Sequence, residues 1–83
     1  MTREELRAVV VSALGRVAPE VDVGSLDAKA NLREQCDLDS VDFLNFVVAL
    51  HDATGVEIPD TDNAKLSSVD ACVGYLERAL TKR

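Results

Sequence analysis

The residues with the clearest chemical potential are one serine and the aspartates around it. Ser40 lies between Asp39 and Asp42, and a strongly apolar segment follows at once. A serine hydroxyl becomes a nucleophile only when a general base lies within hydrogen-bond reach. The single histidine, His51, stands eleven residues later, which is ~16 Å along the helix expected there. A catalytic Ser-His pair within one chain is therefore excluded, and no glycine-rich phosphate loop is present, so the sequence predicts no enzyme activity.

The same acidic cluster resembles the start of a calcium-binding loop. Residues 37–42 have the sequence D-L-D-S-V-D, as at the opening of an EF-hand. That loop needs Asx at its fifth position, Gly at its sixth and Glu at its twelfth. This chain has Val41, Asp42 and Val48 at those positions. We therefore expect no metal site.

The length and composition favour a small helical protein. With 83 residues the chain has the size of one small domain, and residues 1–83 are predicted to form a single one. Apolar residues make up 47% of the chain and aromatic residues only 4%, which suits packed helices better than a sheet. Cys36 and Cys72 lack metal-ligand spacing and do not indicate a disulfide framework. We expect them to be buried or idle thiols.

The charge is distributed unevenly along the chain. The net charge is −6, and no Lys or Arg occurs between Arg33 and Lys65. The acids in that interval are Glu34, Asp37, Asp39, Asp42, Asp52, Glu57, Asp60 and Asp62. Nucleic acid and membrane surfaces are therefore poor candidate partners, whereas a basic protein face is a good one. The simpler interpretation is a solvated face that only keeps the domain soluble.

The N-terminus carries no recognisable targeting signal. It begins MTREELRAVV, which is charged and has no apolar signal-peptide core. No segment approaches the ~20 apolar residues of a membrane span. We expect a soluble, cytoplasmic monomer. A chain that starts at Met and ends soon after its last helix also suggests a free-standing protein, although excision from a larger synthase stays open.

The first helix is well delimited. Thr2 and Glu5 form a predicted capping box, and Pro19 ends the helix after Ala18. Apolar residues recur between them at helical spacing: Leu6, Val9, Val10, Ala13, Leu14 and Val17. A long connection follows over residues 20–39. Its apolar residues are predicted to hold it across the bundle: Val21, Val23, Leu26 and Leu32, with Ala30 and Cys36 as smaller contributors.

The second helix starts at the serine. Asp39 is predicted to cap it, with Asp42 at the third position, and Gly55 ends it. Its predicted buried residues are Phe43, Phe46, Val47 and Leu50. A polar stripe is predicted from Asp42, Asn45, Ala49 and Asp52, and is bordered by Val41, Leu44 and Val48. These three aliphatic residues either face solvent or pack against the long connection.

The rest of the chain contains two further helix-boundary patterns. Pro59 breaks it before a short helical turn over residues 60–65 that Asp60 is predicted to cap. Ser67 and Asp70 form a predicted capping box for the last helix, whose apolar residues are Val69, Cys72, Val73, Leu76 and Leu80. We therefore expect an all-α, four-helix bundle with a long loop between helices one and two and a short third helix.

These patterns together resemble the acyl carrier protein family. The sequence D39-S-V-D42, followed by F43-L-N-F-V-V-A-L50 and G55-V-E-I-P59, is similar to the family's Asp-Ser-Leu motif and the helix after it. The resemblance extends over essentially the whole chain. It implies that a phosphopantetheinyl transferase moves 4′-phosphopantetheine from coenzyme A to Ser40, which Asp39 flanks.

The resemblance also implies a function and partners. The arm's thiol would hold acyl intermediates as thioesters for acyl-transferring or condensing enzymes of fatty acid, polyketide or related lipid biosynthesis. Basic faces on those enzymes would dock on the second helix, through the residues Val41, Asp42, Leu44, Asn45, Val48 and Asp52. The chain departs from the family by having Asp37-Leu38 where Gly is common, and Asn45 and His51 where acids are common.

Two alternatives remain open. A peptidyl carrier would hold an aminoacyl group, but the Gly-Gly-x-Ser signature of such carriers is absent, which favours an acyl cargo. The chain could instead be a helical interaction module that is never modified. In that case Ser40 is simply a residue of a first helical turn.

Overall fold

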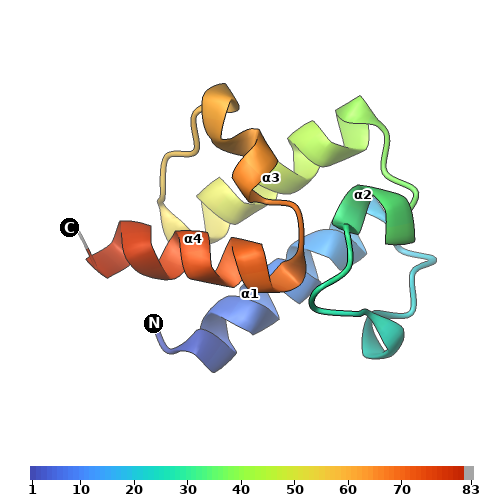
Figure 1. The fold of residues 1–83 in the computed structure, drawn as a ribbon, viewed down its shortest axis with the longest axis horizontal. Coiled ribbons are helices and arrows are strands. Elements are labelled where there is room, and N and C mark those ends of the chain that lie inside the picture. The colour runs from blue at the N-terminus through green and yellow to red at the C-terminus, as the bar shows by residue number, and fades with distance from the viewer. Residues whose placement is uncertain (82–83) are drawn as a thin grey trace.

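The structure is a computed structural model that describes residues 1–81, and every regular element in that part of the chain is helical (Figure 1). In chain order the elements are α1 (Arg3–Val17), η1 (Val23–Ser25), α2 (Leu32–Gln35), α3 (Ser40–Thr54), η2 (Asp60–Lys65) and α4 (Val69–Thr81). The two η segments are 3₁₀ helices. The predicted all-α fold is confirmed. None of the helices within residues 1–81 is long and apolar enough to cross a membrane.

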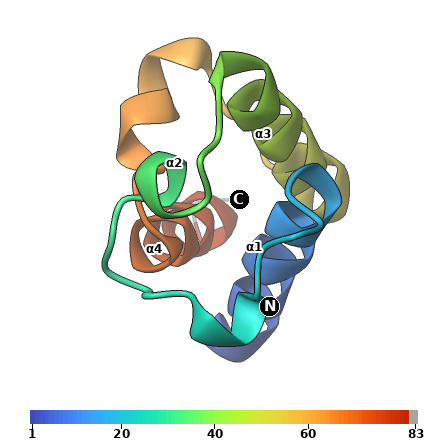
Figure 2. The same ribbon diagram turned by 90° about the vertical axis from the view of Figure 1, so that its right-hand side faces the viewer.

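The three long helices are arranged around α1. α1 packs against both α3 and α4, and the start of α1 and the end of α4 lie at one end of the molecule, with α2 near the other (Figure 1). Figure 2 looks onto the α2 end and shows α2 beside the start of α4. Two backbone hydrogen bonds make that connection, from Leu32 N–H to Ser67 O at 2.8 Å and from Asp70 N–H to Ala28 O at 2.9 Å. The long connection is therefore fixed to the bundle by its backbone as well as its side chains.

The predicted capping box of α1 is present. Thr2 Oγ1 accepts from Glu5 N–H at 3.1 Å, and Glu5 Oε1 accepts from Thr2 N–H at 2.9 Å. The hydrogen bond from the Thr2 backbone, together with that to its side chain, lowers the pKa of Glu5. At the other end, Ala18 caps the helix and Pro19 follows. α1 therefore begins and ends at the residues that the sequence predicts.

The connection between α1 and α3 contains two short helices that the sequence pattern did not indicate. Asp22 caps η1, and Asn31 Oδ1 accepts from Glu34 N–H at 3.0 Å to cap α2. Leu32 is buried as predicted, but Val23 is 42% exposed. The prediction for Val23 was wrong because η1 forms a turn at the surface. Leu38, which the pattern did not single out, is buried and takes part in anchoring the connection.

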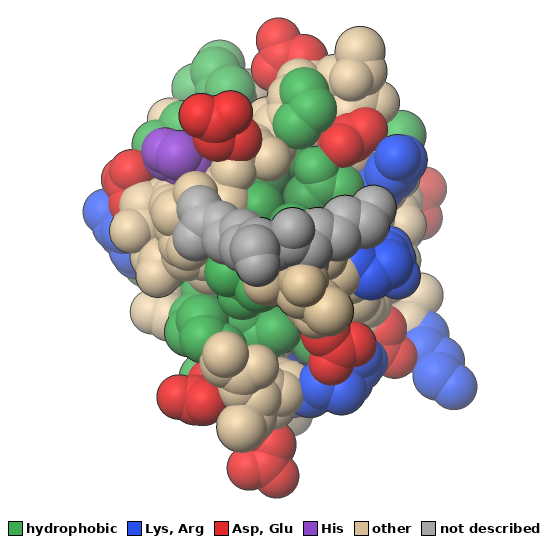
Figure 3. Space-filling model, turned by 90° about the vertical axis from the view of Figure 1, so that its left-hand side faces the viewer, with side chains coloured by type: hydrophobic (Ala, Val, Ile, Leu, Met, Phe, Trp, Pro, Cys, Tyr) green, Lys and Arg blue, Asp and Glu red, His purple; other side chains and the backbone are tan. Residues whose placement is uncertain are grey.

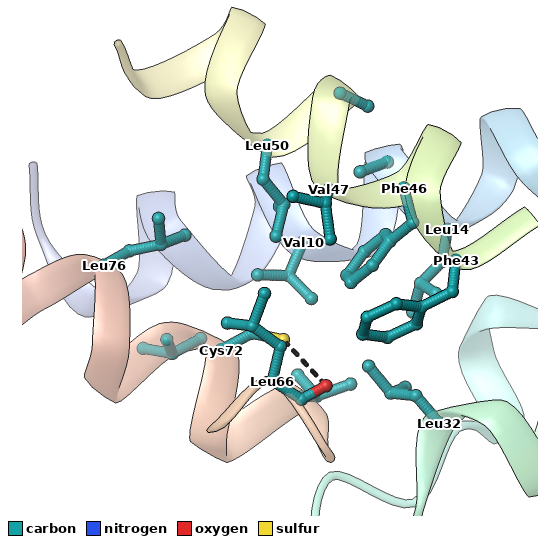
Figure 4. Close-up of a cluster of buried hydrophobic side chains, with 14 of the residues drawn as sticks. Val10, Leu14, Leu32, Phe43, Phe46, Val47, Leu50, Leu66, Cys72 and Leu76 are labelled. Atoms are coloured by element: carbon teal, nitrogen blue, oxygen red, sulfur yellow. Dashed lines mark hydrogen bonds between the residues drawn. The ribbon is translucent and has the colours of Figure 1, made fainter. Parts of the chain in front are cut away.

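Side chains from every long helix meet in one core (Figure 4). Its fully buried large members are Phe46, Leu6, Leu14, Leu32, Leu50, Leu66, Leu76, Val10, Val69 and Cys72. Both cysteines are buried free thiols. Burial raises the pKa of Cys72 to about 12 and also raises the pKa of Cys36. The Cys72 Sγ donates to Leu66 O at 3.7 Å, so this thiol is a structural member of the core, as expected.

Two predicted caps are corrected by the structure. Ser68, and not Ser67, caps α4, since Ser68 Oγ accepts from Ala71 N–H at 3.0 Å. The Ser67 carbonyl instead accepts a hydrogen bond from the Leu32 N–H of α2. Asp60 is the first residue of η2 and does not cap it, because the preceding Pro59 occupies the cap position without a side-chain hydrogen bond.

The surface at the end where α1 begins and α4 ends mixes acidic, basic and apolar side chains (Figure 3). The histidine, drawn in purple, is exposed there. His51 Nδ1 lies 2.9 Å from Val56 O, just after α3 ends. His51 is therefore a surface residue, and its ring contacts the backbone that leaves the helix.

Candidate functional site

The candidate site is the first turn of α3. Ser40 is the first residue of the helix, and its side chain is exposed. Asp39 Oδ1 accepts from Asp42 N–H at 2.8 Å, and Asp42 Oδ2 accepts from Asp39 N–H at 3.4 Å. The two aspartates thus cap the helix reciprocally, as predicted. Within residues 1–81 the Ser40 hydroxyl has no protein hydrogen-bond partner, so it is available to another molecule.

The end of α2 fixes where this turn begins. Asp37 has a φ of 51°, in the left-handed region, and the Leu38 N–H donates to Arg33 O at 2.9 Å. This is the long hydrogen bond of a Schellman-type helix end, in which Gly usually holds the left-handed position. Asp tolerates that position better than most residues. Asp37 therefore holds the left-handed position that Gly usually takes, and buried Leu38 sets Asp39 directly after it.

The local electrostatics suit a covalently attached anion. Helix geometry leaves the Ser40 and Val41 N–H groups without partners inside the helix, and the positive end of the macrodipole stabilises a nearby anion by about 0.3–1 kcal/mol. The carboxylates of Asp39 and Asp42 repel an anion by about 1 kcal/mol each at close range in water. The summed repulsion of about 2 kcal/mol exceeds the dipole stabilisation. The turn alone would not hold a free phosphate, whereas a covalent phosphodiester needs no net attraction.

Three aliphatic side chains beside the serine face outward. Val41 is 64% exposed, Leu44 52% and Val48 48%. The alternative that they pack against the long connection is therefore wrong. Exposed apolar residues in a cluster on one helix are typical of a contact surface.

The polar stripe differs from the prediction at one position. Asn45 and Asp52 are exposed and Asp42 is partly buried, but Ala49 is only 6% exposed. Ala49 lines narrow grooves between α3 and α1 together with Ala13 and Arg16. A small side chain is needed there because the two helices pack closely.

A pocket opens next to the serine. Its volume is about 500 Å³, and it is lined by Asn31, Arg33, Ser40, Phe43, Leu44, Asn63, Ala64, Leu66 and Ser67. A second groove of about 570 Å³ runs past Val47, Val48 and Ile58. Leu44 lines both and separates them.

Sequence reasoning missed the residues from outside α3 that line the pocket. Arg33 comes from α2 and Asn63 from η2, and neither carries a local signal that associates it with Ser40. Only their proximity in the folded chain reveals the pocket.

A family profile described as "Phosphopantetheine attachment site" matches residues 4–76. The match spans most of the chain, so the protein belongs to the class of carriers that bear 4′-phosphopantetheine as their cofactor. Within that class its relatives are acyl carrier proteins. The chain is 42% identical over 74 residues to the acyl carrier protein of Campylobacter hominis, covering 89% of this chain and 87% of that one. The protein thus belongs to the acyl carrier protein family.

A second relative and a solved structure support the same family assignment. The chain is 36% identical over 58 residues to the acyl carrier protein of Lactobacillus acidophilus, covering 70% of this chain and 72% of that one. The solved structure of an acyl carrier protein from Enterococcus faecalis superimposes with a TM-score of 0.79 at 29% identity, covering 95% of this chain and 99% of that one. The four-helix acyl-carrier-like fold predicted from the sequence is confirmed, with α2 and η1 as additions within the long loop.

Proposed function

We propose that Ser40 carries the 4′-phosphopantetheine arm and that the protein holds acyl groups on it for partner enzymes. The observation that carries this proposal is the exposed, unpartnered hydroxyl of Ser40 at the start of α3. It lies between two capping aspartates, in a chain that matches the attachment-site profile. Two of the other serines have their hydroxyls engaged: Ser25 hydrogen-bonds to Asp22, and Ser68 caps α4.

The attachment reaction is a phosphoryl-group transfer. The Ser40 oxygen forms a bond to the phosphorus nearest pantetheine in coenzyme A, and the bond from that phosphorus to the second phosphate breaks. Adenosine 3′,5′-bisphosphate leaves, and the hydroxyl proton passes to a base of the transferase. The arm's thiol then holds the acyl group as a thioester. The protein itself contributes position and no catalysis, because the neighbouring carboxylates of Asp39 and Asp42 cap the helix and, within residues 1–81, neither of them hydrogen-bonds to the Ser40 hydroxyl as a general base would.

The outward face of α3 is the proposed docking surface, defined by Val41, Asp42, Leu44, Asn45, Val48 and Asp52. Its exposed aliphatic residues offer apolar area that loses water when a partner binds, and its acids attract a basic partner. The partners are a phosphopantetheinyl transferase and acyl-transferring or condensing enzymes of fatty acid, polyketide or related lipid biosynthesis. An acyl cargo is favoured over an aminoacyl cargo by the acyl carrier proteins to which the chain is similar. We also propose that residues 1–83 act as one carrier domain and as a monomer.

Intact-protein mass spectrometry tests this proposal. The apo protein, incubated with coenzyme A and a broad-specificity transferase, should gain the mass of one arm, and peptide mapping should locate it at Ser40. Ser40→Ala should stay folded and gain nothing, whereas Ser25→Ala should be modified like the wild type. An arm on another serine, or no arm on the wild type, would instead favour an unmodified interaction module.

A further inference from the structure

His51 is the only histidine in the chain, and it lies in the last turn of α3 with its side chain exposed. Imidazole is the one side chain whose ordinary titration falls between pH 5 and 8. His51 lines the groove of about 570 Å³ together with Leu44 and Val48. Those two residues also belong to the proposed docking surface. A change in the charge of His51 therefore takes place where a partner would bind.

One hydrogen bond determines which ring nitrogen of His51 gains and loses the proton. Nδ1 lies 2.9 Å from the carbonyl oxygen of Val56. A carbonyl oxygen only accepts, so Nδ1 carries a hydrogen in the neutral ring as well as in the charged one. The proton is then exchanged at Nε2, which has no hydrogen-bond partner within residues 1–81. The ring can therefore change its charge while it keeps its contact to the backbone.

The charged residues around His51 are acidic. Glu57, which follows α3, and Asp60, which begins η2, both line the same groove, and no Lys or Arg among residues 1–81 does so. Asp52 is the next residue of α3 and is exposed. From α1, the cation Arg16 lines a different groove, with Asp52. Figure 3 shows acidic side chains, in red, near the histidine. A neutral His51 leaves this part of the surface fully acidic, whereas a protonated His51 offsets part of its charge.

We propose that His51 determines which partners bind at a given pH: basic partners dock on α3 well when its ring is neutral and less well when it is protonated. The inference rests on the proposed function, because it takes the partners to have basic faces. A neutral Nε2 accepts a hydrogen bond from a Lys or Arg side chain. A protonated Nε2 is a donor on a cation, so it repels the same group. Two unit charges about 4 Å apart in water change a rate about fivefold.

The test measures kcat/KM for attachment of the arm to Ser40 by a broad-specificity phosphopantetheinyl transferase, from about pH 5.5 to about pH 8. His51→Asn is the reference, since its amide N–H can still donate to Val56 O but does not titrate. The ratio of the wild-type value to the His51→Asn value removes the pH dependence of the transferase itself. That ratio should fall about fivefold from the highest to the lowest pH. His51→Lys should be slower than His51→Asn by a factor that does not change with pH.

A matched control places the imidazole elsewhere. Ser12 is exposed on α1 and does not line this groove, so Ser12→His combined with His51→Asn should show no such fall. Nitrogen NMR of the wild type, which needs no variant to fold, should show Nδ1 protonated throughout and only Nε2 titrating. Parallel pH profiles of wild type and His51→Asn, a fall restored by Ser12→His, or titration at Nδ1 would overturn this inference alone. Failure of the arm to attach to Ser40 at any pH would overturn the proposed function and the inference with it.

Discussion

The Tyr75 hydroxyl of α4 donates a 2.6 Å hydrogen bond to Asp62 Oδ2 of η2. This bond connects the last helix to the segment that carries Asn63, so it supports one wall of the pocket beside Ser40. Hydrogen bonds from Tyr75 and then Lys65 lower the pKa of Asp62. Burial and the bond to Asp62 raise the pKa of Tyr75 to about 12.

The first prediction concerns this pair. Because the pKa of Asp62 is lower in the folded state, its contribution to stability is present above the ordinary carboxyl pKa of about 4 and is lost as pH falls through the lowered value. Because the pKa of Tyr75 is raised, its contribution is present below about 10 and is lost as pH rises toward 12. Tyr75→Phe should lower Tm at pH 7 and reduce both losses. Circular dichroism melts from pH 2 to 11 measure this.

Asp60→Asn is the control for that experiment. Asp60 is an exposed acid of the same 3₁₀ helix, and Tyr75 bonds to Asp62 instead. The control variant should lose Tm at acid and at alkaline pH as the wild type does. A Tyr75→Phe profile identical to wild type would mean that the bond contributes nothing in solution.

The second prediction concerns the left-handed residue at the end of α2. Asp37 has a φ of 51°, a conformation that costs most L-residues about 1–2 kcal/mol. Asp37→Gly should therefore raise the free energy of unfolding by less than about 1 kcal/mol, because Asp tolerates this region better than most residues and the entropy that glycine gains in the unfolded chain is deducted. Asp37→Val should lower it by more than 1 kcal/mol, since β-branched residues tolerate this region worst. Urea titrations give both values.

Asp60→Gly provides the comparison for Asp37→Gly. Asp60 has no positive φ, so glycine there brings only the entropic cost and should be destabilising. Equal effects of glycine at the two positions would show that Asp37 is not strained in solution.

The third prediction contrasts two leucines of α3. Leu50 is fully buried, whereas Leu44 is 52% exposed. Leu50→Ala should cost about 2–5 kcal/mol of stability because it leaves a cavity in the core, and Leu44→Ala should cost less than about 0.5 kcal/mol. The rate of modification by the transferase should show the opposite order. Leu44→Ala should slow it more than Leu50→Ala does. A large loss of stability for Leu44→Ala would indicate that this side chain is packed in solution.

The fourth prediction concerns the acids of the proposed docking surface. Asp42 and Asp70 both lie in the first turn of a helix, where each contributes about 0.3–1 kcal/mol of dipole stabilisation. Lysine at either position makes the same change in net charge. Asp42→Lys should slow modification of Ser40 about tenfold or more, and Asp70→Lys should slow it little. Rising salt should slow the wild type, because exposed charges are screened over ~8–10 Å.

Equal modification rates for the two lysine variants, both folded, would show that the acids of α3 only solvate the surface. Recognition would then depend on Ser40 and the exposed Val41, Leu44 and Val48. Thermal melts of both variants are required beside the rates, so that a docking effect is separated from a loss of stability.

The amino-acid sequence by itself determined the features that depend on residues a few positions apart. The Thr2–Glu5 box of α1, the Asp39–Asp42 box of α3 and the left-handed Gly55 at its end are all present as predicted. Each is formed by hydrogen bonds or backbone conformations within one turn of chain, so the local sequence specifies it. The location of Ser40 in the first turn of α3 follows from the same local bonds.

Only the tertiary structure decided the features that depend on distant contacts. α2 forms in a loop of weak helical signal because buried Leu32 and its bond to Ser67 support it. The hydrogen bond from Leu38 N–H to Arg33 O accompanies a left-handed backbone conformation at Asp37. An aspartate in the sequence indicates that conformation only weakly. Ser68 replaces Ser67 as the cap because α4 begins at Val69, which places the Ser68 hydroxyl against the Ala71 N–H.

The pocket beside Ser40 is the clearest feature that depends on contacts between distant parts of the chain. Arg33, Ser40 and Asn63 line it from α2, α3 and η2. Periodicity and capping signals describe one element at a time, and they do not report which faces of separate elements meet. The packing of α1 against α3 and α4, with η2 held to α4 through Tyr75, determines that meeting. The position of Ser40, the proposed attachment residue, was therefore predictable from local sequence, whereas its surroundings required the fold.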